Sequence, residues 1–193
     1  MRDGEWLSDD TLNPFLLKYV QDAVPLTHVF QTHFFSRLRE GGEYRYRNVE
    51  RWGRRISQRL SRRIGEHIED GWKRLRVLYV PINLGNWHWV FIRVDMRRKA
   101  IELYDSQGYV KPSNRQYLHD MKQYLYDELT KNLPQNSRPT FEVWRRRWRA
   151  VDKSREAPKQ LNTWGLWRVH IAYHIPQLQR RSNLPTDVRP TLC

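Results

Sequence analysis

The chain has 193 residues, 39% of them hydrophobic and 13% aromatic, which is enough to build the core of one compact domain. Lysine and arginine (35) outnumber aspartate and glutamate (21), and the net charge of +14 favours anionic partners such as nucleic acid, phosphorylated lipid or an acidic protein. Cys193 is the sole cysteine, so an intramolecular disulfide and a multi-cysteine zinc site are excluded.

No run of 18 apolar residues occurs, and the first residues lack the apolar core of a signal peptide. We therefore expect an intracellular protein that makes no membrane contact, with the nucleus as a candidate compartment. We expect one domain over residues 1–179 and a disordered tail over 180–193. Because chain ends are poorly ordered, Cys193 is a weak candidate for a nucleophile.

The first third of the chain is predicted to be mainly helical. Ser8 can cap a helix that Pro25 ends, and an aromatic-rich segment follows over 29–38. Residues 49–64 have helical periodicity, with an apolar stripe predicted to be core and arginines on the remaining surface. The stripe is Val49, Trp52, Ile56, Leu60 and Ile64, and the arginines are Arg51, Arg54, Arg55, Arg59, Arg62 and Arg63.

Strands are predicted in the middle of the chain, where β-branched and aromatic residues are concentrated: residues 77–83, 89–94 and 100–105. Helical spacing resumes over 116–129. Farther along, residues 141–144 could begin another strand, 145–153 form a basic stretch expected to be solvated, and 165–175 are a candidate apolar helix.

A short connection, residues 95–98, indicates that the second and third of these strands pair as an antiparallel hairpin. If Val94 lies opposite Lys99, then His88 lies opposite Asp105, with Cβ atoms roughly 4.5–5.5 Å apart. A register shifted by two residues leaves the pair diagonal, at roughly 7–8 Å, on the same face of the sheet.

A histidine held by a carboxylate is suited to nucleophilic catalysis. One ring nitrogen accepts a proton from a thiol or hydroxyl, while the carboxylate fixes the tautomer and stabilises the imidazolium. The alternative is that His88 only ends a strand and Asp105 only begins a turn, with no catalytic role.

Two segments, residues 80–95 (VPINLGNWHWVFIRVD) and 101–108 (IELYDSQG), closely resemble the sentrin (SUMO) protease and Ulp family of ubiquitin-like-protein-specific cysteine proteases. Upstream, residues 6–13 resemble the family's Trp-Leu-Asn-Asp helix entry, and the Phe34-Phe35 pair and residues 46–52 resemble its aromatic and Arg-Trp segments. The resemblance implies an α+β, papain-like cysteine-protease fold of the Ulp/adenain type, with a central sheet flanked by helices.

Carried over by position, the resemblance makes His88 the general base, Asp105 its orienting acid and Gln160 a donor to the oxyanion hole. Trp6 and Trp89 would line a narrow tunnel for the Gly-Gly tail of a ubiquitin-like protein such as SUMO, although both could instead be core residues. No metal or organic cofactor is implied.

The nucleophile is where this chain departs from the family. The family continues from its glutamine through an asparagine to Asp-Cys-Gly, whereas this chain reads QLNTWGLW over 160–167. If Gly165 is the family glycine, the Asp-Cys pair is missing, and an ungapped alignment instead places Leu166 at the nucleophile. The hydroxyl of Thr163 is nearby but is not at the required position.

Three hypotheses follow. The first is an inactive protease homologue, a pseudoenzyme that still binds a ubiquitin-like protein. The second is an active cysteine protease, a hydrolase, whose sequence has lost two codons between Trp164 and Gly165. The third is a basic nucleic-acid-binding module that uses residues 145–147 and the arginines of 51–63 to contact phosphates.

Overall fold

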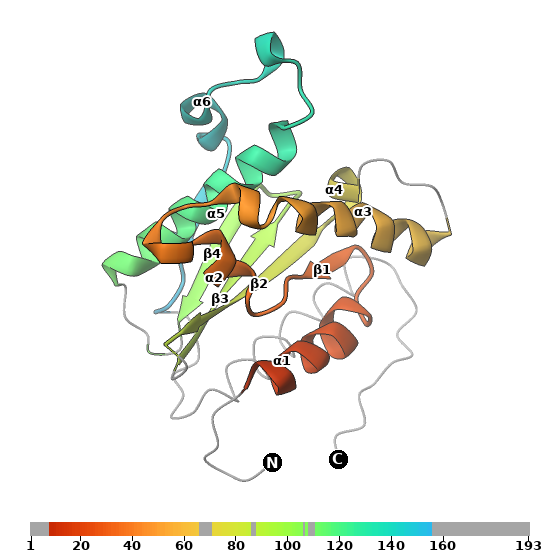
Figure 1. Cartoon of the computed structure of the whole chain (residues 1–193), viewed down its shortest axis with the longest axis vertical. Coiled ribbons are helices and arrows are strands. Elements are labelled where there is room, and N and C mark those ends of the chain that lie inside the picture. The colour runs from red at the N-terminus through yellow and green to blue at the C-terminus, as the bar shows by residue number, and fades with distance from the viewer. Residues whose placement is uncertain (1–7, 66–70, 86–87, 106, 108–110, 156–193) are drawn as a thin grey trace.

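The computed structural model describes residues 8–65, 71–85, 88–105, 107 and 111–155. Within these residues the architecture is α+β, as predicted: helices pack against one mixed sheet (Figure 1). The predicted helix at 165–175 and the tail at 180–193 lie outside the described residues. None of the helices in the described part of the chain is long and apolar enough to cross a membrane.

A five-stranded sheet forms the centre of the molecule, with the strands in sequence order. The three inner strands are antiparallel neighbours, whereas both edge strands run parallel to the strand beside them. The strands are β1 (Thr27–Val29), β2 (Val77–Leu84), β3 (His88–Asp95), β4 (Ala100–Asp105) and β5 (Arg149–Asp152). The three strands predicted in the middle of the chain are therefore confirmed within a residue or two at each end.

Helices cover both faces of the sheet. Figure 1 shows α2, α3 and α5 over one face, with α1 separate from them. The helices are α1 (Asp9–Leu16), continued by a π-helical turn (Leu17–Gln21), α2 (Phe34–Leu38), α3 (Glu50–Ile64), α4 (Gly71–Arg74), α5 (Pro112–Thr130) and α6 (Phe141–Arg145). Short 3-10 turns occupy Glu40–Gly42, Tyr46–Asn48 and Gln135–Ser137.

The inner strands are buried on both faces, because successive side chains point to opposite sides of a strand and each side packs into a core. On one side, Val80, Ile92 and Leu103 belong to a core that also contains residues of α2, α3 and α5. On the other side, Tyr79 and Phe91 pack with residues of α1 in a second core. This two-sided burial explains why β2 and β3 read as almost continuous apolar runs in the sequence.

Helix α3 agrees with the predicted apolar stripe except at its carboxyl end. Val49, Ile56 and Leu60 are buried, while Trp52 is half-buried and Ile64 is 38% exposed. The helix ends at Ile64 because Gly65 adopts a left-handed conformation, with φ 75°, and caps it. The last position of the stripe is therefore exposed, and its prediction as a core residue was wrong.

For residues 141–153, one prediction was wrong and one strand was missed. Residues 141–144, predicted to begin a strand, form α6, whose first turn is capped by the Thr140 hydroxyl accepting a hydrogen bond from the backbone N–H of Val143. In the basic stretch that follows, Arg145, Arg146, Arg147 and Arg149 are exposed, as predicted, but the stretch also contains the edge strand β5, which was not predicted. Trp144 and Trp148, on either side of the three consecutive arginines, are buried and stack with ring centroids 5.3 Å apart.

Candidate active site

His88 and Asp105 meet at one end of the β3–β4 pair. His88 is the first residue of β3 and Asp105 is the last residue of β4. The predicted register was wrong by two residues: Asp105 lies opposite Val90, so His88 is diagonal to it. Since a shift of two preserves the face, both side chains still point to the same side of the sheet.

The two side chains are in direct contact. His88 Nε2 lies 2.7 Å from Asp105 Oδ1, and the residues are 5% and 0% exposed. A separation this short is that of a charge-assisted hydrogen bond, which is strong because the site excludes water. The predicted meeting of an imidazole and a carboxylate is therefore present, by diagonal and not by direct pairing.

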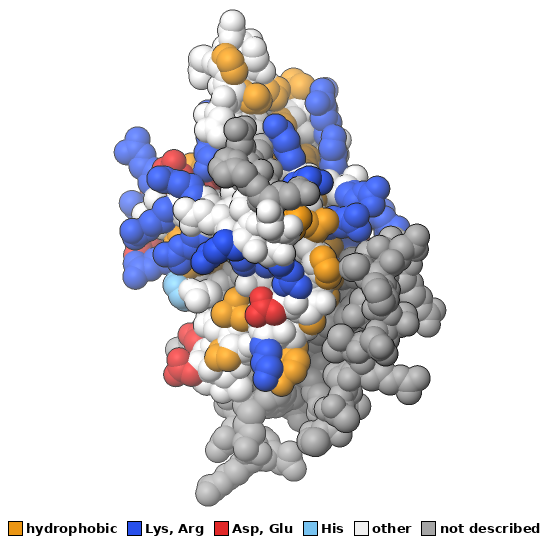
Figure 2. Space-filling view, turned by 90° about the vertical axis from the view of Figure 1, so that its right-hand side faces the viewer, with side chains coloured by type: hydrophobic (Ala, Val, Ile, Leu, Met, Phe, Trp, Pro, Cys, Tyr) orange, Lys and Arg blue, Asp and Glu red, His pale blue; other side chains and the backbone are white. Residues whose placement is uncertain are grey.

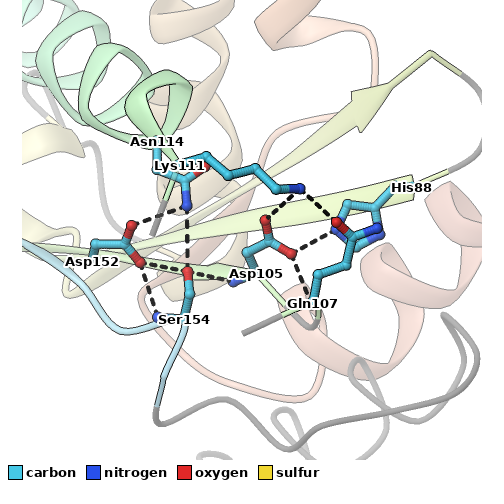
Figure 3. A network of polar contacts seen from close by, with 7 residues as sticks. All are labelled: His88, Asp105, Gln107, Lys111, Asn114, Asp152 and Ser154. Atoms are coloured by element: carbon cyan, nitrogen blue, oxygen red, sulfur yellow. Dashed lines mark hydrogen bonds and ion pairs between the residues drawn. The ribbon is translucent and has the colours of Figure 1, made fainter. Parts of the chain in front are cut away.

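Asp105 is held in place by its own backbone and by the turn that follows it. Its Oδ1 also accepts a hydrogen bond from the backbone N–H of Gln107, at 2.9 Å. Its backbone N–H donates to the Ser154 hydroxyl, at 3.2 Å. Figure 3 shows the carboxylate between the imidazole on one side and Ser154 on the other. The orientation of the carboxylate is thus fixed before any ligand binds.

Lys111 supplies a second positive group to this carboxylate. Its Nζ lies 3.6 Å from Asp105 Oδ2 and donates a hydrogen bond of 2.5 Å to Gln107 Oε1 (Figure 3). Oδ2 accepts no hydrogen bond within the described residues, so the ion pair with Lys111 is its main compensation there. Oδ1 of Asp105 therefore contacts an imidazole, and Oδ2 lies near an ammonium group.

A polar network behind Asp105 joins β4, β5 and α5. Asp152 accepts hydrogen bonds from the side chain of Asn114, at 2.9 Å, and from both the hydroxyl and the backbone N–H of Ser154. Asn114 and Ser154 are fully buried. Because Ser154 also accepts from the backbone of Asp105, the network ties the end of β4 to the neighbouring strand and helix.

The environment of Asp105 favours its ionised form. Burial raises the pKa of its carboxyl group, but the hydrogen bonds from His88 and Gln107 and the electrostatic attraction of His88 and Lys111 lower it, and the net pKa lies below its ordinary value. An ionised Asp105 accepts the Nε2–H of His88. That tautomer leaves proton exchange with a reacting group to Nδ1.

Of the other predicted site residues, Trp89 alone lies in the described part of the chain. Trp89 follows His88 in β3 but faces the opposite side of the sheet, where its indole is 3% exposed and packs in the α1 core. Its role in binding a tail stays a prediction. Trp6, Gln160 and the segment 163–166 lie outside the described residues.

Sequence reasoning missed Lys111, Asn114, Asp152 and Ser154. Asp152 lies in the basic stretch 145–153 and Ser154 directly follows it, and without β5 nothing placed them beside β4. Lys111 immediately precedes Pro112, the first residue of α5, a position that Pro favours. That signal locates the start of a helix close after Asp105, although it does not identify the contact.

Known proteins that are similar to this chain in sequence include ubiquitin-like-specific and sentrin-specific proteases. Ubiquitin-like-specific protease 1 of Saccharomyces cerevisiae is 29% identical over 125 residues, which are 64% of this chain and 17% of that protein. Human sentrin-specific protease 2 is 26% identical over 166 residues, 84% of this chain and 24% of that protein. The chain thus spans about a fifth of the length of these relatives.

Solved structures share the fold. The carboxy-terminal Ulp1 protease domain in complex with Smt3, the yeast ortholog of SUMO, superposes with a TM-score of 0.61 at 22% identity, covering 95% of this chain and 69% of that one. A SUMO protease Ulp1 structure whose catalytic cysteine is oxidised to a sulfenic acid gives 0.63, also at 22% identity, with 97% and 72% covered. The family model for the Ulp1 protease family, C-terminal catalytic domain, matches residues 5–162. On this match, which covers most of the sequence, the chain belongs to the Ulp1 protease family.

Proposed function

We propose that this chain binds a ubiquitin-like protein of the SUMO type by its Gly-Gly tail but does not hydrolyse it. The observation that supports the proposal is a buried His88–Asp105 contact in a chain whose sole cysteine is Cys193. The matched residues end at 162, just before the segment where the resemblance places the missing Asp-Cys pair. The acid–base half of a protease site is kept, whereas the attacking group is not.

The missing thiol decides the chemistry. In a cysteine protease of this design, Nδ1 of His88 would take the thiol proton, and the thiolate would attack the carbonyl carbon of the last glycine of the tail. The bond from that carbon to the leaving amine would break, the amine would depart with the proton from His88, and water would hydrolyse the resulting thioester. Backbone N–H groups and Gln160 would stabilise the oxyanion. Neither Leu166 nor Trp164 has an atom that can attack a carbonyl carbon. A chain without the thiol retains, on this proposal, only the binding step.

Binding is tested with immobilised SUMO-type protein and immobilised ubiquitin, each prepared with and without its terminal Gly-Gly. We expect retention of the purified chain on at least one tail-bearing protein and much weaker retention on the matched protein without the tail. Equal retention on a column without protein would refute the binding proposal. In parallel, a fusion partner joined to the carboxy terminus of the same ubiquitin-like protein should stay attached when the unaltered chain is added. Cleavage of this fusion by the unaltered chain would refute the loss of activity.

An insertion tests the site itself. Placing Asp-Cys between Trp164 and Gly165 should give cleavage of the fusion, and adding His88→Gln to that variant should abolish it because the thiol loses its base. Cleavage that survives His88→Gln would show that His88 has no catalytic role. If sequencing of the transcript instead reveals an Asp-Cys pair at this point, the chain is an active protease and the two-codon alternative is correct.

The nucleic-acid alternative stays a prediction. Its support is the +14 charge and the arginines of α3, five of which are exposed: Arg51, Arg54, Arg55, Arg62 and Arg63. Binding to single-stranded DNA or RNA that falls steeply with added salt would support it.

A further inference from the structure

A cavity of about 330 Å³ lies where α3 passes the segment that contains β1. Its walls come from the π-helical turn Leu17–Gln21, from residues 28–31 and from α3. It lies at the other end of β2 from His88, since β1 pairs with the first residues of β2 and His88 pairs with the last. This volume is at the lower end of the range for small-molecule sites.

The described residues that line the cavity include three arginines, Arg55, Arg59 and Arg62, and no aspartate or glutamate. Arg59 is half-buried and is fixed by donating a hydrogen bond to the Thr27 carbonyl. Arg62 donates from Nε to the Gln58 carbonyl, and Arg55 makes no polar contact with a described residue. Figure 2 shows lysine and arginine side chains gathered in a band across the middle of this face of the molecule.

His28 supplies a second, independent feature of the cavity. It is 8% exposed, it lines the cavity, and its Nδ1 is buried without a hydrogen-bond partner in the described part of the chain. Its ring packs edge-on against Phe30, with centroids 5.1 Å apart. Burial and the charge of Arg59 lower the pKa of His28 to about 3, so the ring is neutral and retains one N–H that can donate to a ligand.

We propose that this cavity binds a phosphate monoester. A phosphate has several acceptor oxygens and close to two negative charges, which suit forked guanidinium donors together with an imidazole N–H. A single carboxylate would leave most of these donors without an acceptor. Trp52, half-buried at the wall, provides an apolar surface for the organic part of the ligand.

The test is an NMR titration of the ¹⁵N-labelled full chain at low salt with O-phosphoserine, adenosine 5′-monophosphate, inorganic phosphate and L-aspartate. We expect the organic phosphates to shift the amides of residues 28–31 and α3, and L-aspartate to shift them much less. Arg55→Gln should weaken phosphate binding about tenfold, the usual cost of losing one charge-assisted hydrogen bond. Whichever organic phosphate binds more tightly identifies the source of the group, and tight binding of either supports the proposal.

Arg54→Gln is the matched control, because Arg54 neighbours Arg55, is also exposed on α3 and does not line the cavity. It should change the affinity less than about twofold, the small effect of one screened surface charge. Equal weakening by both substitutions would mean that ions gather on a general basic surface, and the proposal would be wrong. Absence of shifts, or equal shifts by L-aspartate, would also overturn it. None of these outcomes bears on tail binding or on His88.

Discussion

The carboxylate of Asp105 is fully buried and has an imidazole and the Gln107 N–H on one oxygen and Lys111 near the other. Asp105→Asn should lower the free energy of unfolding by about 1–3 kcal/mol, because a charge-assisted acceptor becomes a neutral amide in a dry site. In a double-mutant cycle with His88→Gln, the coupling energy should be about 0.5–3 kcal/mol. Urea unfolding of the four proteins measures both values. Asp10→Asn, on the exposed first turn of α1, is the control and should be nearly neutral.

The same carboxylate predicts a pH dependence. Because the pKa of Asp105 is lower in the folded chain, its ionised form contributes stability at pH values above the unfolded pKa of about 3.9, and this contribution is lost as pH falls through the folded pKa. The difference in stability between the unaltered chain and Asp105→Asn should therefore shrink below about pH 4. Lys111→Met should move this loss to higher pH, because Lys111 helps to lower that pKa. A difference that stays constant in acid would contradict the assignment.

Sequence reasoning could find the two partners of this contact but not their support. His88 and Asp105 lie in segments with strong local signals, and a register error of two residues does not change the face on which they lie. Ser154 and Asp152 are brought to Asp105 by the parallel strand β5. The charged residues in and around β5 do not form a strand pattern, so the local sequence does not predict the contact.

Between elements, the packing of α4 on α3 depends on Gly71. A methyl group added there would lie 2.6 Å from the Ser57 Cα, which is backbone and cannot move aside. Gly71→Ala should therefore lower the free energy of unfolding by about 1–3 kcal/mol. The matched comparison is Gly53→Ala in α3, where the added methyl meets the carboxylate end of Glu128, a side chain with rotatable bonds.

We expect Gly53→Ala to cost less than Gly71→Ala, since alanine favours a helix by about 1 kcal/mol over glycine and offsets part of the displacement of Glu128. Thermal unfolding of both variants ranks them. The reverse order would show that Glu128, which accepts from Tyr46 and pairs with Lys131, is held more rigidly than the α3–α4 contact.

The turn between β3 and β4 explains the register error. Asp95 pairs with Ala100, and its side chain accepts a hydrogen bond from the backbone N–H of Arg98, so Lys99 belongs to the turn and not to the strand. Lys99 has φ 49°, a left-handed conformation that sequence gives little reason to expect of lysine. Propensity and alternation place the strands, but a backbone conformation at one residue sets their pairing.

Lys99→Gly should consequently stabilise the chain, because it removes a strain of about 1 kcal/mol that exceeds the added entropy of the unfolded state. Arg98→Gly, at the neighbouring turn position without a positive φ, should instead destabilise by about 0.5–1 kcal/mol. Chemical denaturation separates the two outcomes. Equal losses in both variants would mean that the Lys99 conformation carries no strain.

At the scale of the whole molecule, the class of fold followed from the family resemblance of the segments around His88, and the positions of the central strands followed from their β-branched and aromatic residues. The two edge strands did not. β1 and β5 have three and four residues, and each reaches its neighbour only after a long stretch of intervening chain. Short edge strands give weak periodic signals, and parallel pairing leaves no hairpin turn in the sequence to indicate it.

This arrangement has a consequence for folding kinetics. The antiparallel pairs β2–β3 and β3–β4 close over short turns, whereas β1–β2 and β4–β5 each join residues about fifty positions apart in the sequence, and long closures cost more chain entropy. We expect the amides of β3 to gain protection before those of β1 and β5 in pulse-labelling hydrogen exchange during refolding. Simultaneous protection would instead mean that the edge strands belong to the folding nucleus. If β5 pairs late, as we expect, the polar support behind Asp105 is the last part of the site to assemble, because Ser154 follows β5.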